Sequence, residues 1–304
     1  KKKGYKNILT VSRKELDLSS PKEVEEWFKK KRPEIVVLAA AKVGGILANN
    51  EFPTDFLLEN LKIQNNIIEN SWKYNVHRLL FLGSSCIFPK YAPQPIKEEY
   101  LLHSPLEPTN QWYAIAKIAG LKLCEAFRKQ YDFDAISLMP TNLYGPGDNY
   151  NLETSHVIPA LIRKFHNAKV KKEKQVFCWG SGKPKREFLH VDDLGEASVF
   201  VLEKWDPKSK NSPKTSNNEI LNHLNVGQGI DCTIKYLAEM IAENFEYSGE
   251  IIWDNSKPDG TPKKLLDIRN ITNLGWSPKI SLEKGIKMTI KSYLEEINSR
   301  KLRI

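Results

Sequence analysis

Residues 78–89 read RLLFLGSSCIFP, an apolar run that stops on two serines and a cysteine. A short run that is apolar throughout is typical of a parallel-sheet strand buried on both faces. Comparable runs occur in the first half of the chain at residues 7–13 (NILTVSR), 34–40 (EIVVLAA) and 135–145 (AISLMPTNLYG). Amphipathic stretches between them predict helices at Pro21–Lys31, Asp55–Tyr74 and Trp112–Tyr131. The alternation predicts an α/β fold with a doubly wound parallel sheet of the Rossmann type.

In a doubly wound sheet, ligands bind beyond the carboxyl ends of the strands. Ser84, Ser85 and Cys86 directly follow one such end, where packing alone gives little reason for two hydroxyls and a thiol. Residues 39–45 and 141–145 occupy the equivalent positions after two other predicted strands. We therefore expect these three segments to line one binding crevice.

The pattern changes after Tyr144, where a turn-rich connection begins. Beyond it the sequence predicts helices at Val157–Ala168 and Thr233–Phe245, strands at Val176–Gly180 and at residues 220–227 and 249–254, and a polar loop at Glu203–Asn218. We interpret residues 1–149 as a dinucleotide-binding domain, to which residues from about 188 to 225 return. Residues 150–304 are interpreted mainly as a smaller, mixed substrate domain, with the ligand cleft between the two.

The composition narrows the classes of function. The 304 residues include 46 Lys and Arg against 37 Asp and Glu, a net charge of +9, which indicates lysine-rich solvated faces and an attraction for an anionic ligand. No apolar run approaches the roughly 18 residues that span a bilayer. The four cysteines lie far apart without a C-x-x-C pair, which argues against disulfides and a metal site and favours a cytoplasmic protein. The basic residues form no recognisable nucleic-acid-binding module, so we expect neither nucleic acid nor membrane as a partner.

Tyr113 and Lys117 form the most informative pair in the chain. Residues at i and i+4 lie on one face of a helix. A lysine ammonium near a phenol lowers the pKa of the phenol from about 10 and makes it a usable acid near neutral pH. A serine at the neighbouring strand end, such as Ser84, can hold a substrate carbonyl. Reduction of a ketone by hydride needs such a proton donor for the alkoxide, so the pattern predicts a ketone reductase.

Several longer segments point to a family. They are AAAKVGGILANN (residues 39–50), FLGSSCIFPK (81–90), EPTNQWYAIAKIAG (107–120), MPTNLYGPGDN (139–149), SHVIPALIRKFH (155–166), WGSGKPKREFLHVDD (179–193), NVGQGIDCTI (225–234) and KPDGTPKKLLD (257–267). With them the chain resembles the extended short-chain dehydrogenase/reductases, which use a Ser-Tyr-Lys triad with a nicotinamide cofactor. Among these it is most similar to the GDP-L-fucose synthase family.

The resemblance implies one chemistry and a set of catalytic residues. The expected reaction is NADPH-dependent reduction of the C4 ketone of GDP-4-keto-6-deoxy-D-mannose, after epimerisation at C3 and C5, to give GDP-L-fucose. Ser84, Tyr113 and Lys117 match the reductive triad, while Cys86 and His156 match the acid–base pair for epimerisation. Removal of a proton at C3 or C5 gives an enolate that the triad can stabilise. We expect Cys86 to be the base and His156 the acid, with the reverse assignment open.

The cofactor is expected to be NADP(H). Arg13 ends a strand-like run at the place where a Rossmann domain distinguishes NADP from NAD, and a guanidinium there can pair with the 2′-phosphate. The resemblance implies cofactor contacts at Arg13, Asp17, Leu18, Ala39, Ala40, Ala41, Leu82, Gly83, Ser84, Ser85, Tyr113, Lys117, Pro140, Thr141, Asn142, Leu143 and His156.

The resemblance also implies how a GDP-sugar is bound. The expected substrate contacts are Asn142, Lys164, Trp179, Arg186 and Lys264. The aromatic face of Trp179 can stack on the guanine, and the guanidinium of Arg186 can bind the diphosphate. By analogy, the two long predicted helices of the first half are expected to form a homodimer interface.

Two features leave the assignment open. The family's glycine-rich loop after the first strand is absent from the printed sequence, and we expect it to precede Lys1, because Lys1–Gly4 resemble the end of a helix. A related GDP-4-keto sugar, such as a 6-deoxyheptose that a separate enzyme epimerises, is an alternative substrate. A non-catalytic NADP-binding sensor or scaffold is an alternative of another class, against which the intact triad argues.

Overall fold

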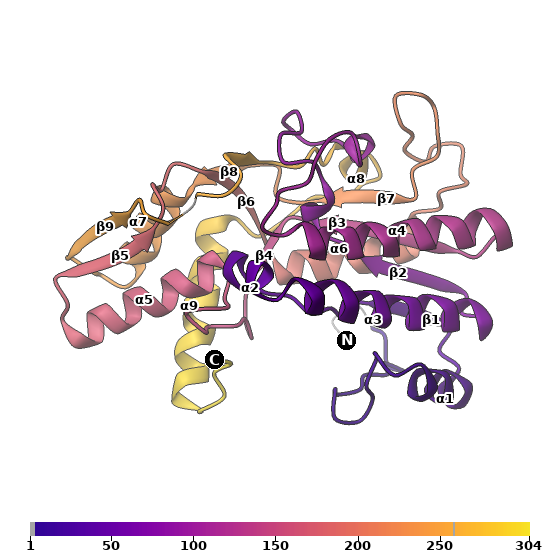
Figure 1. Cartoon of the computed structure of the whole chain (residues 1–304), viewed down its shortest axis with the longest axis horizontal. Helices are drawn as coiled ribbons and strands as arrows, with labels where there is room; N and C mark the ends of the chain where they lie inside the picture. The colour runs from indigo at the N-terminus through magenta and orange to yellow at the C-terminus, as the bar shows by residue number, and fades with distance from the viewer. Residues whose placement is uncertain (1–3, 258) are drawn as a thin grey trace.

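A four-stranded parallel sheet forms the centre of one part of the molecule, on the right of Figure 1. The computed structural model describes residues 4–257 and 259–304. The strands follow the order β1-β2-β3-β7, and each adjacent pair is parallel. Their bounds are β1 Ile35–Leu38, β2 Arg78–Leu82, β3 Ala135–Pro140 and β7 His223–Val226. The predicted α/β fold with a parallel sheet is therefore confirmed.

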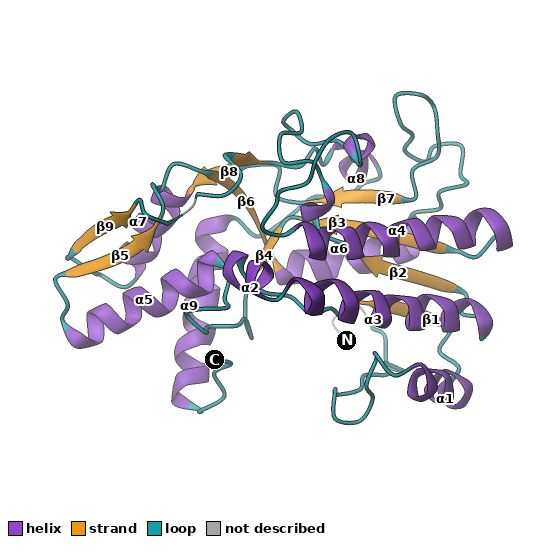
Figure 2. Ribbon diagram, in the orientation of Figure 1, coloured by secondary structure: helices purple, strands orange, loops and turns teal. Residues whose placement is uncertain are grey.

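Alternate residues of β2 pack into two different hydrophobic cores, one on each face of this sheet. Leu79 and Phe81 belong to the core that is shared with α1, α3 and α4, whereas Leu80 belongs to the core that is shared with α6. Figure 2 shows α3 and α4 side by side in front of the strands and α6 behind them. Because both faces are covered, the residues of β2 after Arg78 are apolar on both sides of the strand. The helix bounds are α1 Pro21–Lys31, α3 Pro53–Lys73, α4 Gln111–Tyr131 and α6 Val191–Lys204.

Local sequence signals set the ends of the helices. In α1, the Ser20 hydroxyl accepts a hydrogen bond from the backbone N–H of Glu23, and Pro21 begins the first turn. Arg32 ends the helix in the left-handed conformation, with φ of 45°. The predicted bounds of α1 are confirmed, and those of α3 and α4 differ from the prediction only by one or two residues at an end.

The second part of the molecule contains two smaller sheets and the helices that pack on them. β5 pairs with β9 in parallel, while β6 pairs with β4 and β10 in parallel and with β8 in antiparallel orientation. Phe165 of α5, Leu237 of α7 and Ile286 of α9 share one hydrophobic core there. The bounds are β4 Asn142–Tyr144, β5 Gln175–Trp179, β6 Lys185–His190, β8 Asp231–Thr233, β9 Glu250–Asp254, β10 Lys263–Lys264, α5 Val157–Lys171, α7 Ile234–Asn244 and α9 Leu282–Asn298.

The chain passes from one part to the other more than once. β3 ends at Pro140 in the main sheet, and after Thr141 the chain continues as β4 in the other part, so the single predicted run at residues 135–145 is divided in two. The backbone N–H of Thr141 donates to the carbonyl of Val226, at the end of β7. β6 then leads through His190 into α6, which returns to the main sheet. Short helical turns complete the fold: α2 Ile46–Glu51, α8 Arg269–Asn273, η1 Ser85–Ile87 and η2 Glu98–Tyr100.

The strand that was predicted at residues 7–13 is absent. Ile8, Leu9 and Val11 are exposed and belong to no strand. A strand is held by hydrogen bonds to a neighbouring strand, and among the described residues nothing pairs with this segment. β1 is correspondingly an edge strand, with Ile35 and Val37 also exposed. The prediction was therefore wrong for this segment, and Lys1–Lys3 of the predicted helix end lie outside the described residues.

Over residues 4–257 and 259–304, no helix is long and apolar enough to cross a bilayer. Over the same ranges, no group of three or more His, Cys, Asp or Glu side chains is arranged to hold a metal ion.

Candidate active site

A cavity of about 600 Å³ lies beyond the carboxyl ends of β2 and β3, between the two parts of the molecule. The sequence-predicted residues that line it are Gly83, Ser84, Ser85, Cys86, Tyr113, Pro140, Thr141, Asn142, Leu143, His156, Lys164, Trp179, Arg186 and Lys264. All predicted substrate contacts are among them. So are all predicted catalytic residues except Lys117. The structure thus brings together side chains that are up to 180 positions apart in the sequence, from Ser84 to Lys264.

Lys117 lies just behind the cavity wall, on the same face of α4 as Tyr113. Its Nζ donates a hydrogen bond of 2.8 Å to the carbonyl of Leu82, the last residue of β2. The same Nζ lies 5.9 Å from the centre of the Tyr113 ring and 4.8 Å from that of Phe81. Burial lowers the pKa of Lys117 to about 8. Lys117 is therefore a buried cation that joins α4 to the strand end carrying Ser84.

The electrostatics of Tyr113 differ from the sequence-based expectation. Burial raises the pKa of Tyr113 above its ordinary value, and a negative charge on Cys86 would raise it further. Only the hydrogen bond with Ser84 lowers the pKa of this phenol. Lys117 does not offset the burial, because its ammonium donates to the Leu82 carbonyl instead of the phenol. Tyr113 thus keeps its proton at neutral pH, which suits a proton donor.

Cys86 lies in η1, the single turn that follows Ser84. The Ser84 hydroxyl accepts a hydrogen bond of 3.2 Å from the backbone N–H of Cys86, which caps this turn. The Cys86 sulfur in turn accepts from the Asn110 side-chain amide at 3.7 Å and from the Lys264 ammonium at 3.6 Å. The thiol is half-buried and faces the cavity. A serine and a cysteine from one short turn therefore reach the same space.

His156 enters the cavity from the second part of the molecule. It is the residue that precedes α5, and its side chain makes no capping hydrogen bond to that helix. Burial lowers the pKa of His156, which favours the neutral imidazole at neutral pH. A neutral imidazole can accept or donate a proton, so the position suits an acid–base group.

Trp179 and Arg186 also line the cavity. Trp179 is half exposed, and the Nζ atoms of Lys164 and Lys257 each lie 5.6 Å from its ring centre. Lys164 also donates to the carbonyl of Phe177 at 2.8 Å. Arg186 donates to the backbone carbonyls of Lys185 and Asp259, and its guanidinium faces the cavity. An aromatic face with cations near it can stack on a base, and a guanidinium that lines the same cavity can bind phosphates.

The predicted cofactor residues divide into two groups. Ser84, Ser85 and residues 140–143 line the cavity beside Tyr113, so the polar groups on this wall fit the reactive half of a dinucleotide. The predicted residues that do not line the cavity are Arg13, Asp17, Leu18, Ala39, Ala40, Ala41, Leu82 and Lys117. Ala39–Ala41 follow β1, and Arg13 lies on an exposed turn. The Asp17 carboxylate is used locally, because it accepts hydrogen bonds from Ser19.

Comparison with known proteins gives the family. Residues 1–227 match the model of the NAD dependent epimerase/dehydratase family. The chain belongs to this family. One similar relative is a putative GDP-L-fucose synthase 2 of Arabidopsis thaliana. It is 52% identical to this chain, and the match covers 98% of this chain and 87% of the relative.

Two solved structures have the same fold as this chain. A GDP-6-OMe-4-keto-L-xylo-heptose reductase from C. jejuni has 38% sequence identity and a TM-score of 0.91, and the match covers 97% of this chain and 92% of that one. A GDP-L-fucose synthetase from Naegleria fowleri bound to NADP has 27% identity and a TM-score of 0.84, and the match covers 97% of this chain and 87% of that one. The extended short-chain dehydrogenase/reductase resemblance is therefore confirmed.

Two further residues that support this site were missed from the sequence: Asn110, which lines the cavity, and Glu187, which is buried behind its wall. Asn110 precedes α4 and contacts the Cys86 sulfur. The Glu187 carboxylate accepts hydrogen bonds from the backbone N–H groups of Gly229 (2.6 Å) and Leu266 (3.0 Å), and its backbone carbonyl accepts from the side chains of Thr141 and Asn142. Glu187 thus ties the predicted cofactor wall to the segment that carries Lys264. A glutamate inside a strand pattern gives no sequence signal for such a role, and neither does an asparagine before a helix.

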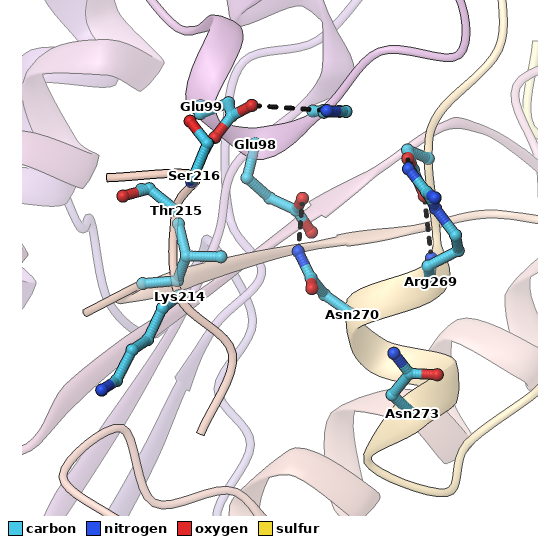
Figure 3. Close-up of a pocket in the computed structure, with 11 residues that line it drawn as sticks. Glu98, Glu99, Lys214, Thr215, Ser216, Arg269, Asn270 and Asn273 are labelled. Carbon is cyan, nitrogen blue, oxygen red and sulfur yellow. Dashed lines mark hydrogen bonds and ion pairs between the residues drawn. The ribbon is translucent and has the colours of Figure 1, made fainter. Parts of the chain in front are cut away.

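A separate pocket of about 300 Å³ lies between η2, α8 and the loop around Thr215 (Figure 3). The Glu98 carboxylate is buried there and accepts hydrogen bonds from the Asn270 amide at 2.8 Å and from the backbone N–H of Asn225 at 3.0 Å. Burial raises the pKa of Glu98 to about 7. Arg269, which is labelled in Figure 3, forms an ion pair with Asp267 in the same pocket. The predicted catalytic residues do not line it.

Proposed function

We propose that this chain is an NADPH-dependent epimerase and reductase that converts GDP-4-keto-6-deoxy-D-mannose to GDP-L-fucose. The observation that carries the proposal is the convergence of two sets of groups on one cavity: Ser84 and Tyr113 for reduction, and Cys86 and His156 for proton transfer. Both reactions act around a single ketone, so they need one shared binding place for its oxygen. The names of the relatives support the same substrate class.

The reductive step follows from the hydrogen bonds around Tyr113. When bound, NADPH supplies the hydride that reduces C4. Ser84 is proposed to hold the C4 oxygen, and Tyr113 to donate its proton to that oxygen as negative charge develops there. The raised pKa of Tyr113 keeps this proton in place until it is needed. Lys117 fixes the end of β2 through Leu82 and places a positive charge behind the phenol.

The epimerisation step uses the same oxygen. Removal of the proton from C3 or C5 breaks a C–H bond and moves its electron pair toward the C4 oxygen, where Ser84 and Tyr113 stabilise the enolate. Return of a proton to the other face of the ring carbon inverts it. Cys86 and His156 are proposed as the two groups that exchange these protons.

The nucleotide half of the substrate is assigned to the part of the cavity that Trp179 and Arg186 line. Trp179 is proposed to stack on the guanine, with Lys164 beside it, and Arg186 to bind the diphosphate. Asn142 and Lys264 then face the sugar. In this proposal residues 1–149, with those from about 188 to 225, bind NADP(H), and the remainder mainly binds the GDP-sugar.

A second candidate is reduction of a related GDP-4-keto-heptose, with epimerisation by a separate enzyme. The close structural match to a heptose reductase favours it. The presence of both Cys86 and His156 at the cavity favours the bifunctional reaction instead. A binding protein without activity is the alternative of another class, and it would bind NADP without turnover.

One paired assay separates these functions. The protein is incubated with the hexose or the heptose substrate, and NADPH oxidation is followed by absorbance while proton exchange is followed by mass spectrometry in D₂O. We expect turnover and deuterium uptake at C3 and C5 with the hexose, and uptake is expected to be lost in Cys86→Ser. Turnover of the heptose alone, without exchange, would support the second candidate. Cofactor binding with no turnover of either sugar would overturn both.

We also propose a homodimer through α3 and α4. Large apolar side chains remain exposed along these adjacent helices, among them Leu58, Trp72, Trp112 and Ile115. An exposed apolar surface of this kind suits a second copy of the chain. Light scattering is expected to give twice the mass of 34.9 kDa, and Ile115→Glu is expected to weaken the association. Val170→Glu, at an exposed apolar residue of α5, is the matched control.

A further inference from the structure

Glu107 is a carboxylate of the cavity that the two proposed reactions do not use. The residue is only 9% exposed, and it lies on the segment that leads into α4. A glutamate is seldom buried unless a cation pairs with it. In the part of the chain that the structure describes, its side chain is hydrogen-bonded by Thr109 alone, and no Lys, Arg or His forms an ion pair with it. An ion pair therefore does not explain its burial.

The two oxygens of the Glu107 carboxylate differ in their partners. Oε2 accepts hydrogen bonds from the backbone N–H of Thr109 at 3.0 Å and from the Thr109 hydroxyl. Within the described ranges nothing donates to Oε1, yet this atom is not enclosed, unlike the unpartnered Oδ1 of the neighbouring Asn110. The cavity carboxylate of Asp259, in contrast, accepts from Ser181 with both oxygens. Glu107 thus keeps one acceptor oxygen for a donor that enters the cavity.

The turn before α4 fixes the direction of this carboxylate. The carbonyl of Glu107 accepts from the backbone N–H of Asn110 at 3.3 Å, and the carbonyl of Asn110 accepts from the N–H of Ala114 at 3.0 Å. The contacts with Thr109 tie the end of the Glu107 side chain to the same turn. Because Tyr113 lies in the first turn of α4, Glu107 and Tyr113 are held on one support. A group that is fixed relative to the proton donor can orient the ring that carries the ketone.

Glu107 is close to two groups that are assigned to different parts of the sugar. Asn110, which is bonded to Glu107 through the backbone, donates from its side chain to the Cys86 sulfur at 3.7 Å. Burial lowers the pKa of Arg186, and negative charges nearby, among them that of Glu107, act in the opposite direction. Cys86 is assigned to the protons on C3 and C5, and Arg186 to the diphosphate on C1. C2 is the ring carbon that joins C1 to C3, so Glu107 is expected beside C2.

The chemistry of a carboxylate restricts what it can hold in a GDP-sugar. It repels the diphosphate, and it cannot accept a hydrogen bond from the ketone or from the methyl group at C6. A hydroxyl is the donor that remains. The C2 hydroxyl is attached to a carbon that the proposed reactions leave unchanged, since they invert C3 and C5 and reduce C4. A fixed acceptor therefore suits the C2 hydroxyl.

Taking the proposed function as given, we propose that Glu107 determines specificity at C2 of the sugar, by accepting a hydrogen bond from the C2 hydroxyl through Oε1. The direction of this hydroxyl distinguishes a mannose-type ring from a glucose-type ring. A ring with the opposite direction leaves a buried carboxylate oxygen without its donor, which disfavours binding. A GDP-4-keto-heptose of the mannose type has the same hydroxyl, so the contact applies to either candidate substrate.

Binding measured without turnover tests this contact. The probes are GDP-L-fucose and GDP-2-deoxy-2-fluoro-L-fucose, because fluorine nearly matches a hydroxyl in size but donates no hydrogen bond. By isothermal titration calorimetry, the unmodified protein is expected to bind the fluorinated probe about tenfold more weakly, the effect of losing a hydrogen bond to a charged group. Glu107→Met removes the acceptor, so this variant is expected to bind the two probes with equal affinity. Its affinity for GDP, which has no sugar, is expected to be kept.

Variants of matched chemistry make the outcome specific. Glu107→Gln keeps an acceptor oxygen without the charge and is expected to retain part of the discrimination between the probes. Glu153→Met removes an exposed carboxylate of the same cavity and is expected to retain all of it. Equal binding of the two probes to the unmodified protein would overturn the contact, and so would full discrimination in Glu107→Met. Thermal unfolding shows whether each variant is folded, and if Glu107→Met is not, the unmodified protein and Glu107→Gln decide.

Kinetics separate binding of the hydroxyl from acid–base catalysis by Glu107. With GDP-4-keto-6-deoxy-D-mannose and NADPH, Glu107→Met is expected to raise KM about tenfold with little change in kcat, since the contact is present before and during the reaction. Deuterium exchange at C3 and C5 is expected to persist in this variant. Loss of exchange at saturating substrate would show that Glu107 is a base and would overturn its role as a hydroxyl acceptor.

The two assays together also separate this contact from the proposed function. Discrimination between the probes without any NADPH oxidation would overturn the proposed function alone. Turnover of the sugar with equal binding of the two probes would overturn the contact alone. Failure of every GDP-sugar to bind would overturn both.

Discussion

The Lys117 ammonium donates its 2.8 Å hydrogen bond to the Leu82 carbonyl, not to the phenol of Tyr113 four residues earlier. The spacing of the two residues on α4 is the one that the sequence suggested, yet the direct partner is the backbone of β2. Lys117 therefore has two effects: it fixes the strand end that leads to Ser84, and it places a buried charge near the Tyr113 ring.

The buried charge of Lys117 predicts a pH dependence. Because burial lowers the pKa of Lys117 to about 8, the reductase rate is expected to fall as pH rises through this value and the charge is lost. Lys117→Met is expected to be slow and to lack this decline. Lys122→Met, which removes an exposed cation of the same helix, is the control and is expected to keep it. The measurement is the rate of NADPH oxidation against pH, and equal profiles for all three proteins would contradict the role.

Lys117 also makes the free energy of unfolding depend on pH, in a direction that its pKa determines. In the unfolded chain its pKa is near 10.5, so between about 8 and 10.5 the folded chain binds fewer protons at this residue. The free energy of unfolding from this group therefore rises with pH in that window. Urea unfolding at several pH values is expected to show the slope in the unmodified protein and to lose it in Lys117→Met.

Removal of the Tyr113 hydroxyl tests the proton donor. Tyr113→Phe is expected to lower kcat for NADPH oxidation by about 10²–10⁴, the usual contribution of a general acid. Cofactor binding, measured by fluorescence, is expected to persist. Tyr131→Phe changes an exposed tyrosine at the other end of α4 and is expected to leave kcat unaltered. A Tyr113→Phe protein with normal kcat would exclude this phenol as the donor.

The proposed binding of the diphosphate by Arg186 depends on the planar guanidinium group, which can donate two hydrogen bonds to one phosphate. Arg186→Lys keeps the charge but loses bidentate binding, so the affinity for GDP is expected to fall about tenfold, or about 1.4 kcal/mol. Isothermal titration calorimetry with GDP measures the change. Arg269→Lys is the control, because Arg269 lies in the separate pocket of Figure 3 and pairs with Asp267. Equal losses in the two variants would argue for a general charge effect.

The buried Glu98 carboxyl predicts a second pH effect, on stability alone. Its pKa is raised from 4.5 to about 7, so between these values the folded chain binds more protons than the unfolded chain. The free energy of unfolding is therefore expected to fall as pH rises through this window. Glu98→Gln cannot ionise. The difference in free energy of unfolding between this variant and the unmodified protein is therefore expected to shift in favour of the variant by about 3 kcal/mol between acid pH and pH above 7.

The neighbouring Glu99 provides the control for Glu98. The backbone N–H of Ser216 lowers the pKa of Glu99, so its stabilisation is present above the unfolded pKa and is lost as pH falls. Glu99→Gln is therefore expected to change the pH dependence with the opposite sign. The same slope in Glu98→Gln and in the unmodified protein would show that Glu98 does not titrate in this window.

Much of the fold followed from local patterns. The uninterrupted apolar run of β2 and the helix signals at Ser20 and Pro21 each have a local physical cause, and the structure has both elements where the sequence predicts them. The run at residues 7–13 has the same local pattern but no strand, because a strand also depends on a neighbour that the pattern does not specify.

The chemistry of the site was predictable only in part. Ser84, Cys86 and Tyr113 follow from strand ends and helix spacing, and the cavity contains all three. The contacts that control them join distant segments: Lys264 reaches Cys86 across 178 positions, and Asn110 across 24. No periodicity links such residues. The pKa of Tyr113 was wrongly expected to be lowered, because burial and the direction of a lysine side chain are tertiary properties.

The strand β6 limits where segments can be exchanged between related proteins to make a chimera. Arg186, assigned to the diphosphate, and His190, which begins α6 on the main sheet, belong to this one six-residue strand, and Glu187 between them is bonded to both sides of the cavity. A chimera with its crossover inside β6 would separate residues that depend on one backbone. A recombined enzyme that exchanges sugar specificity should therefore inherit β6, β4 and β10 from a single parent and take only β5, β9 and their loops from the other.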